Sequence, residues 1–158
     1  MKAPEKTPPA DASGLQIGKL RSSLESLGLL VDYLSKIEPF SRYDFGNFTS
    51  ALRQQLSRGE HLVAFSNKRL VGYCGWLPTS TEVAKAWTTD GGPLLPKSGD
   101  EADAVVLTVI ATTESVAMSA LLRRARVENP KRRVYFKREY GDEDRVARKS
   151  SVENVTGK

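Results

Sequence analysis

The stretch from residue 104 to residue 137 decides the fold: AVVLTVIA at 104–111, TTESVAMSALLRRARVENPKR at 112–132 and RVYFK at 133–137. The first run is the most β-branched of the chain and predicts a central, buried strand. Thr112 or Thr113 can cap a helix that stops before Pro130, and residues 133–137 predict another strand. A strand, a helix and a strand in this order predict a right-handed crossover between parallel strands.

Two helices and a hairpin are expected upstream of this crossover. Apolar residues at helical spacing predict a helix over 15–34, and Asp44 can cap a second helix that ends near Gly59. Residues 61–66 (HLVAFS) and 69–77 (RLVGYCGWL) predict strands joined at Asn67-Lys68. Neither strand alternates cleanly between apolar and polar residues, so both of its faces should be covered.

The remaining segments complete a single domain. Residues 80–88 predict a short helix, residues 90–103 a loop, and residues 146–150 a weak last strand. The order predicts an α/β or α+β fold with one sheet and helices on both faces. The expected organisation, in three ranges, is a disordered arm at 1–14, one domain at 15–150 and a frayed tail at 151–158.

Several residues of the hairpin invite a functional interpretation. Gly72 and Gly75 leave space on the second strand, where a backbone or a ligand could approach closely. Pro78 is expected to end that strand. Cys74 lies among apolar residues, which predicts an inert buried thiol, and His61 begins a strand, where a structural role is the favoured interpretation.

Composition excludes several classes of protein. The chain has 158 residues, 24 Lys and Arg, 19 Asp and Glu, and a formal charge of +5. One cysteine and one histidine exclude an internal disulfide, a cysteine-based zinc site and a His-rich metal site. No apolar run is long enough for a membrane span, and no secretory signal is evident, so the cytoplasm is the expected location.

Basic residues are concentrated in one segment. Within residues 123–138 the only acidic residue is Glu128, and the eight basic ones are Arg123, Arg124, Arg126, Lys131, Arg132, Arg133, Lys137 and Arg138. Three interpretations stay open: a solvated helix end, a docking surface for an acidic protein, or a nucleic-acid-binding surface. Elsewhere the sequence offers no glycine-rich phosphate motif before a helix, no G-x-S-x-G motif, and no acidic pair that stands out as an acid/base dyad.

Four short pieces of the sequence match the pattern of a known family: Leu27-Gly28, the junction 39–42 (PFSR), 73–76 (YCGW) and 109–112 (VIAT). In these pieces the chain resembles the bacterial lysine acyltransferases that activate RTX toxins. These pieces follow one another at similar spacing, over about residues 27–138. The family implies a GNAT-like central mixed sheet with helices on both faces, and often a dimer.

The resemblance also implies a function. The family transfers a fatty acyl group from acyl-carrier protein to a lysine of a protein acceptor, a lipidation reaction that needs no bound cofactor. Carrier proteins are acidic, so the resemblance favours carrier docking on Arg123, Arg124, Arg126, Lys131, Arg132 and Arg133. Ser41 and Thr108 stand at the positions of the family's catalytic His and Asp, and neither hydroxyl is basic near neutral pH.

Three functional classes therefore stay open. The first is an acyltransferase with altered machinery, in which positioning of the donor supplies much of the catalysis. The second is a catalytically degenerate relative, a pseudoenzyme or adaptor, that binds a carrier protein or peptide. The third and weakest is a nucleic-acid-binding module that uses the basic segment.

Overall fold

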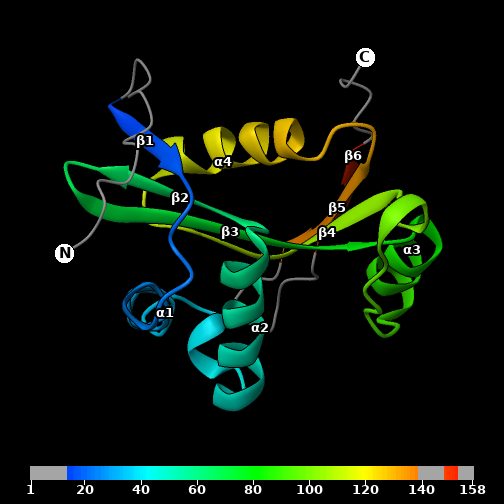
Figure 1. The fold of residues 1–158 in the computed structure, drawn as a ribbon, viewed down its shortest axis with the longest axis horizontal. Helices are drawn as coiled ribbons and strands as arrows, with labels where there is room; N and C mark the ends of the chain where they lie inside the picture. The colour runs from blue at the N-terminus through cyan, green and yellow to red at the C-terminus, as the bar shows by residue number, and fades with distance from the viewer. Residues whose placement is uncertain (1–13, 139–147, 153–158) are drawn as a thin grey trace.

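The computed structural model describes residues 14–138 and 148–152, and these form one sheet flanked by helices (Figure 1). The sheet has six strands that lie in the order of the chain. Only β4 and β5 are parallel; every other neighbouring pair is antiparallel. The strands are β1 (Leu15–Gly18), β2 (His61–Ser66), β3 (Arg69–Thr79), β4 (Ala104–Thr112), β5 (Arg133–Arg138) and β6 (Arg148–Val152).

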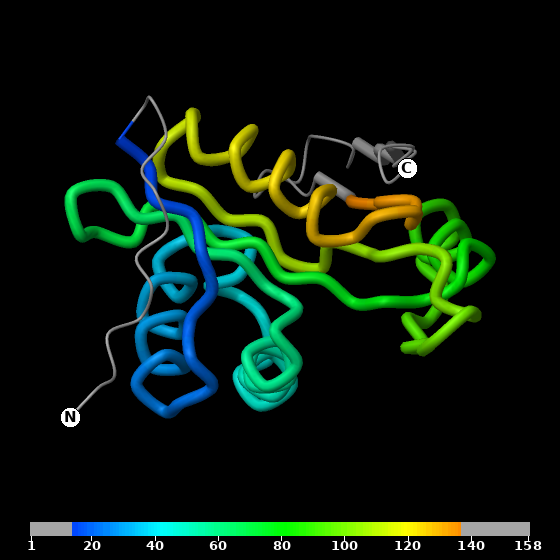
Figure 2. The backbone as a smooth tube through the Cα atoms, turned by 45° about the horizontal axis from the view of Figure 1, so that its top comes forward, coloured from blue at the N-terminus to red at the C-terminus, as the bar shows by residue number. Residues whose placement is uncertain are grey.

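Helices cover both faces of this sheet, as predicted (Figure 2). The helices are α1 (Leu24–Leu34), α2 (Phe45–Arg58), α3 (Thr81–Asp90) and α4 (Ser115–Glu128), with 3-10 turns at Phe40–Arg42 and Gly99–Glu101. On one face, α1 and α2 bury Leu30 and Leu52 against Val109 of β4. Helix α3 covers the far end of the same face, where Ala84 packs against Ala104 and Val106. On the other face, Leu121 of α4 packs against the sheet.

Local signals fix most of these elements. Asp44 caps α2 by accepting a hydrogen bond from the Asn47 N–H, 2.8 Å away, and Gly59 ends the helix. Asn67 and Lys68 both have positive φ, as a two-residue hairpin turn requires. The crossover β4–α4–β5 joins parallel strands as expected.

Several boundaries differ from the prediction. Residues 15–18 form a strand that pairs with β2, so the first helix does not begin at Leu15 but after Ser23, whose hydroxyl accepts from the Ser26 N–H. Pro78 does not end β3, which runs to Thr79. Glu114, rather than Thr112 or Thr113, stands at the start of α4.

The ends of the chain bear on the predicted arm and tail. Residues 1–13 of the predicted arm lie outside the described residues. Strand β6 takes in Ser151 and Val152 from the tail that we expected to be frayed, and residues 153–158 also lie outside the description. In the described part of the chain, no helix has the length and apolar character needed to cross a bilayer.

Candidate functional site

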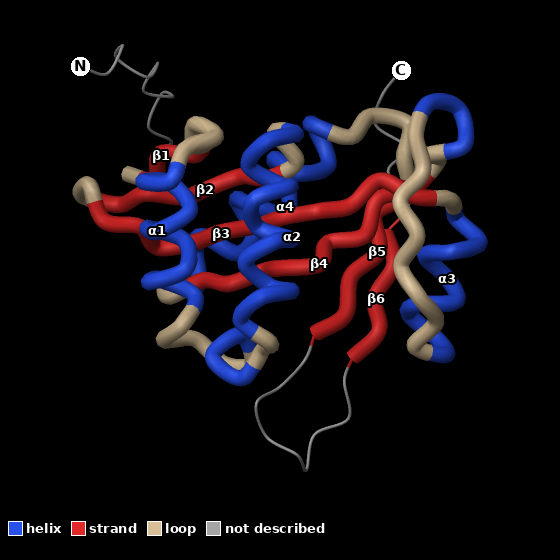
Figure 3. The backbone as a smooth tube through the Cα atoms, turned by 60° about the horizontal axis from the view of Figure 1, so that its bottom comes forward, coloured by secondary structure: helices blue, strands red, loops and turns tan. Residues whose placement is uncertain are grey.

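Strands β4 and β5 separate in the middle of the sheet (Figure 3). Their parallel ladder extends from Ala104 to Leu107 of β4; β4 then continues to Thr112, while β5 pairs with β6. No described strand pairs with β4 on the β5 side beyond Leu107. The backbone groups of this edge are thus placed to bind an extended ligand, as sheet edges do.

Thr108 lies where the strands separate, at an irregularity of the sheet. Trp76 of β3 pairs with Leu107 and Gly75 with Val109, so Thr108 is the extra residue of a β-bulge. Bulges re-aim side chains and occur often beside active sites. The bulge therefore gives Thr108, predicted as a site residue, a position at the separation.

A chain of buried and partly buried hydrogen bonds holds Thr108. Gln55 of α2 donates through Nε2 to Thr108 Oγ1, 2.8 Å away, and its Oε1 accepts from the Tyr73 hydroxyl. Thr108 Oγ1 in turn lies 3.4 Å from the Gly75 carbonyl oxygen, to which it donates. Burial raises the pKa of Tyr73 well above its usual value, so its hydroxyl stays protonated and donates to Gln55.

The glycines of β3 make room for side chains from the two helical layers. A Cβ on Gly75 would meet the Gln55 amide, and a Cβ on Gly72 would lie 2.8 Å from Leu121 Cδ1. Gly72 and Gly75 leave space on β3, as predicted, but side chains fill it and not the backbone or ligand that we expected. Sequence reasoning missed Gln55, although Gly75 was the signal that something lies over β3.

His61 and Cys74 serve structural roles. His61 is buried, accepts from the Leu20 N–H at Nε2 (2.9 Å), and contacts the Gln55 carbonyl oxygen at Nδ1 (3.1 Å). This pattern fits a neutral ring that donates from Nδ1, and burial lowers its pKa. Burial raises the pKa of Cys74 to about 12, so the thiol is protonated and inert, as predicted.

Ser41, the other predicted catalytic position, is exposed in the 3-10 turn before α2. Its N–H bonds to the Ile37 carbonyl oxygen at 3.0 Å. Within the described residues no hydrogen bond joins Ser41 to Thr108. Ser41 lies instead beside an aromatic cluster in which Phe40 contacts both Tyr43 and Phe48.

The predicted basic residues cluster at one end of the molecule. Arg123 and Arg124 are exposed on α4, Arg126 is half-buried, and Lys131, Arg132 and Arg133 follow in the α4–β5 turn and the start of β5. Arg133 pairs with Ala104 at the start of β4. The basic turn thus lies at the end of β4 away from its free edge.

The aromatic residues beside this cluster are largely taken up by the core. Tyr135 is buried and Phe136 is half-buried against the core. Stacking on unpaired bases needs exposed aromatic faces, so these two residues give no support to the nucleic-acid interpretation.

The β4–α4 junction forms the open end of the separation. The Glu114 side chain makes no capping hydrogen bond to the helix, and no glycine lies between Thr112 and Ser115. The Tyr33 hydroxyl of α1 lies 3.4 Å from Thr113 Oγ1. Burial raises the pKa of Tyr33. In the described ranges no group of three or more His, Cys, Asp or Glu side chains could hold a metal ion.

Comparisons with known proteins identify the fold. No protein-family model matches the chain, and no curated protein matches it. Among solved structures, the GNAT-like decarboxylase GphF, in complex with isobutyryl-CoA, is 14% identical over 80% of this chain and 67% of its own, with a TM-score of 0.59. The mosquito arylalkylamine N-acetyltransferase like 5b is 10% identical over 78% of this chain and 76% of its own, with a TM-score of 0.53.

A GNAT-family acetyltransferase from Streptococcus agalactiae gives a similar result: 13% identity, 82% and 78% coverage, and a TM-score of 0.50. At such identities the likeness is one of fold. The chain has a GNAT-like α/β fold, with a mixed central sheet between helices, as the resemblance implied.

Proposed function

We propose that the chain transfers an acyl group from a pantetheine thioester to an amine, with the donor's arm lying along the free edge of β4. The observation that supports this most is the separation of β4 and β5 at the Thr108 bulge. An extended amide-containing arm can bond to such an edge as a peptide strand does. GphF, which shares the fold, was solved with isobutyryl-CoA.

The reaction balances without a protein nucleophile. The lone pair of a neutral amine attacks the thioester carbonyl, a C–N bond forms, and the C–S bond breaks. The proton lost by the amine ends on the departing thiolate, giving an amide and a free thiol. Backbone N–H groups beside the bulge would stabilise the charge on the thioester oxygen in the transition state, and positioning would supply the rest.

A carrier protein is our proposed donor, and a lysine of a protein or peptide our proposed acceptor. A nucleotide pyrophosphate at a helix start needs close approach of the backbone, which glycine permits. The junction from Thr112 to Ser115 has no glycine and carries Glu114, which disfavours a dianionic pyrophosphate. A pantetheine arm attached to a carrier protein has no pyrophosphate group and needs no such binding site. The resemblance also implies a dimer, and we propose this oligomeric state for the chain.

Acyl transfer and donor binding can be tested together. Acyl-carrier protein or acyl-CoA is incubated with lysine peptides, and acylated products are measured by mass spectrometry. A non-hydrolysable donor analogue should protect the amides of Val109–Thr112 from hydrogen exchange. Absence of both product and protection would contradict the proposal.

Replacing Ser41 with alanine should change the acyl-transfer rate by less than about tenfold. Its hydroxyl is exposed and has no basic partner among the described residues, so it cannot act as the general base. Steady-state rates on a lysine peptide measure this. A loss above about a hundredfold would give Ser41 a direct catalytic role instead.

Reversing Arg123 and Arg124 to Glu should weaken carrier-protein binding by about tenfold or more at low salt, with the difference shrinking as salt rises. Both side chains are exposed on α4, so the fold should tolerate the change. Arg53→Glu with Arg69→Glu, two exposed arginines outside α4, is the matched control. Equal affinity of the two double variants, by titration calorimetry, would remove α4 from the docking surface.

A second candidate function is binding without catalysis. In the described residues, the side chains bonded around Thr108 are Gln55 and Tyr73, and none of the three is basic near neutral pH. This observation favours a carrier-binding adaptor. Protection of β4 by the donor analogue without acylated product would identify that function.

A further inference from the structure

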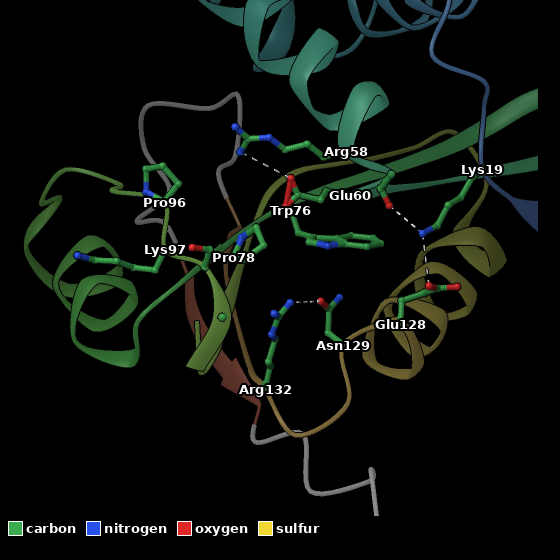
Figure 4. Close-up of a pocket in the computed structure, with 13 residues that line it drawn as sticks. Lys19, Arg58, Glu60, Trp76, Pro78, Pro96, Lys97, Glu128, Asn129 and Arg132 are labelled. Atoms are coloured by element: carbon green, nitrogen blue, oxygen red, sulfur yellow. Dashed lines mark hydrogen bonds and ion pairs between the residues drawn. The ribbon is translucent and has the colours of Figure 1, made fainter. Parts of the chain in front are cut away.

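A cavity of about 630 Å³ lies at the other end of α4 (Figure 4). Its walls come from the β1–α1 connection, the α2–β2 turn, the end of β3, the loop after α3 and the α4–β5 turn. Helix α4 begins beside the free edge of β4 and ends at this cavity. The cavity is large enough for a whole small molecule, and the proposed acyl transfer does not use it.

The charged groups of the cavity wall are unbalanced. Lys19 lies 3.4 Å from Glu128, which also lies 3.4 Å from Arg124. Arg58 lies 3.9 Å from Glu60, and Arg132 also lines the cavity. The lining itself, without Arg124, holds four cations and two carboxylates, an excess of two positive charges: Lys19, Arg58, Lys97 and Arg132 against Glu60 and Glu128.

Arg132 is the best-placed cation of this group. Its Nη1 donates to Asn129 Oδ1 over 3.4 Å, and the buried Asn129 is anchored by its Nδ2, which donates to the Ala125 carbonyl oxygen over 2.9 Å. Figure 4 shows the guanidinium of Arg132 beside Asn129, on the side of the cavity opposite Glu60 and Arg58. A guanidinium held in this way loses little freedom when it binds an oxyanion.

Trp76 and Glu60 complete the wall. Lys19 Nζ lies 5.9 Å from the centre of the Trp76 ring, and Pro78 also lines the cavity, so part of the wall is apolar. Burial raises the pKa of Glu60, against the opposing effect of Arg58, Arg132 and Lys19. The polar and apolar parts together suit a ligand that has a charged head and a carbon skeleton.

We propose that this cavity binds a small phosphomonoester, with Arg132 as the main partner of its phosphate group. A phosphomonoester carries close to two negative charges near neutral pH, which match the excess of two in the wall. The planar guanidinium suits phosphate geometry, and the Trp76 and Pro78 surfaces contact the organic part.

The probe is glycerol 3-phosphate, followed by ¹⁵N NMR of the indole N–H groups of the two tryptophans. The Trp76 signal, assigned with Trp87→Phe, should shift saturably below about 10 mM probe, while the Trp87 signal should not move. Glycerol and inorganic phosphate separate the two parts of the ligand: glycerol should give no shift, and phosphate a weaker one. If inorganic phosphate binds as tightly as glycerol 3-phosphate by this measurement, the assignment of the ligand as a phosphate ester is overturned.

Two variants test the residues. Arg132→Gln should weaken binding by about tenfold or more, whereas Arg69→Gln, exposed at the start of β3 and outside the cavity, should leave it unchanged. Glu60→Gln removes a negative charge and should tighten binding severalfold, which keeps the test open if Arg132→Gln fails to fold.

Two results would overturn the proposal: no saturable shift of the Trp76 signal, or an affinity that neither cavity variant alters. The same is true if a glutamate-rich peptide binds the cavity and the probe does not. Acyl transfer is not measured in this test, so its outcome is independent of the proposed function.

Discussion

Replacing Gly75 with alanine should lower the free energy of unfolding by about 2–4 kcal/mol. The new methyl group would occupy the position of the Gln55 amide. Gln55 must then move, and both of its side-chain hydrogen bonds, to Thr108 and to Tyr73, are lost. Tyr73 is fully buried, so its hydroxyl would be left without an acceptor. Urea denaturation followed by circular dichroism measures the change.

Gly28→Ala provides the matched control. A Cβ on Gly28 meets no atom within 4 Å, and the residue lies inside α1, so alanine should raise stability by up to about 1 kcal/mol. If Gly75→Ala proves as stable as the natural protein, Gln55 has room to rearrange, and the bonded group around Thr108 is not a fixed unit.

The fold was largely predictable because its signals are local. The β-branched run of β4, the Asn67-Lys68 turn and the Asp44 cap each specify their element from adjacent residues. Strand β1 was missed because Leu20 extends the helical spacing of α1 backwards, while a four-residue edge strand gives little pattern of its own.

The continuation of β3 through Pro78 has a tertiary cause. Strand β2 begins at His61, which pairs with Gly75, so β3 has no β2 partner beyond that point. Pro78 pairs with Val105 on the β4 side, and its carbonyl oxygen accepts from the Lys97 N–H. A missing N–H is tolerated at such an edge, but the edge is set by where β2 begins.

The candidate sites were harder to predict, because they join distant segments. Thr108 was found only as an aligned position; its partner Gln55 lies 53 residues away along the chain. The cavity combines Lys19, Glu60, Trp76 and Arg132 from four segments. Sequence analysis grouped Arg132 with its basic neighbours because adjacency was the only relation available, whereas the fold places it across a cavity from Glu60.

Replacing Gln55 with leucine should destabilise the protein by about 2–4 kcal/mol, because the buried Tyr73 hydroxyl loses its acceptor and Thr108 loses a donor. Tyr73→Phe alone leaves Gln55 Oε1 without that donor and should lower stability by about 1 kcal/mol. The double variant removes both partners of the bond. Its loss of stability should therefore be about 1–2 kcal/mol smaller than the sum of the two single losses.

Donor binding to the same double variant then separates packing from function. Its stability should be no lower than that of Gln55→Leu alone, while Thr108 still lacks the hydrogen bond from Gln55. If that bond positions the bulge for the donor's arm, the double variant should fold well and bind the non-hydrolysable analogue at least about tenfold more weakly. Strictly additive stabilities would show that Gln55 and Tyr73 act independently. Undiminished donor binding would confine Gln55 to holding α2 on the sheet, and the free edge of β4 would have to hold the donor without it.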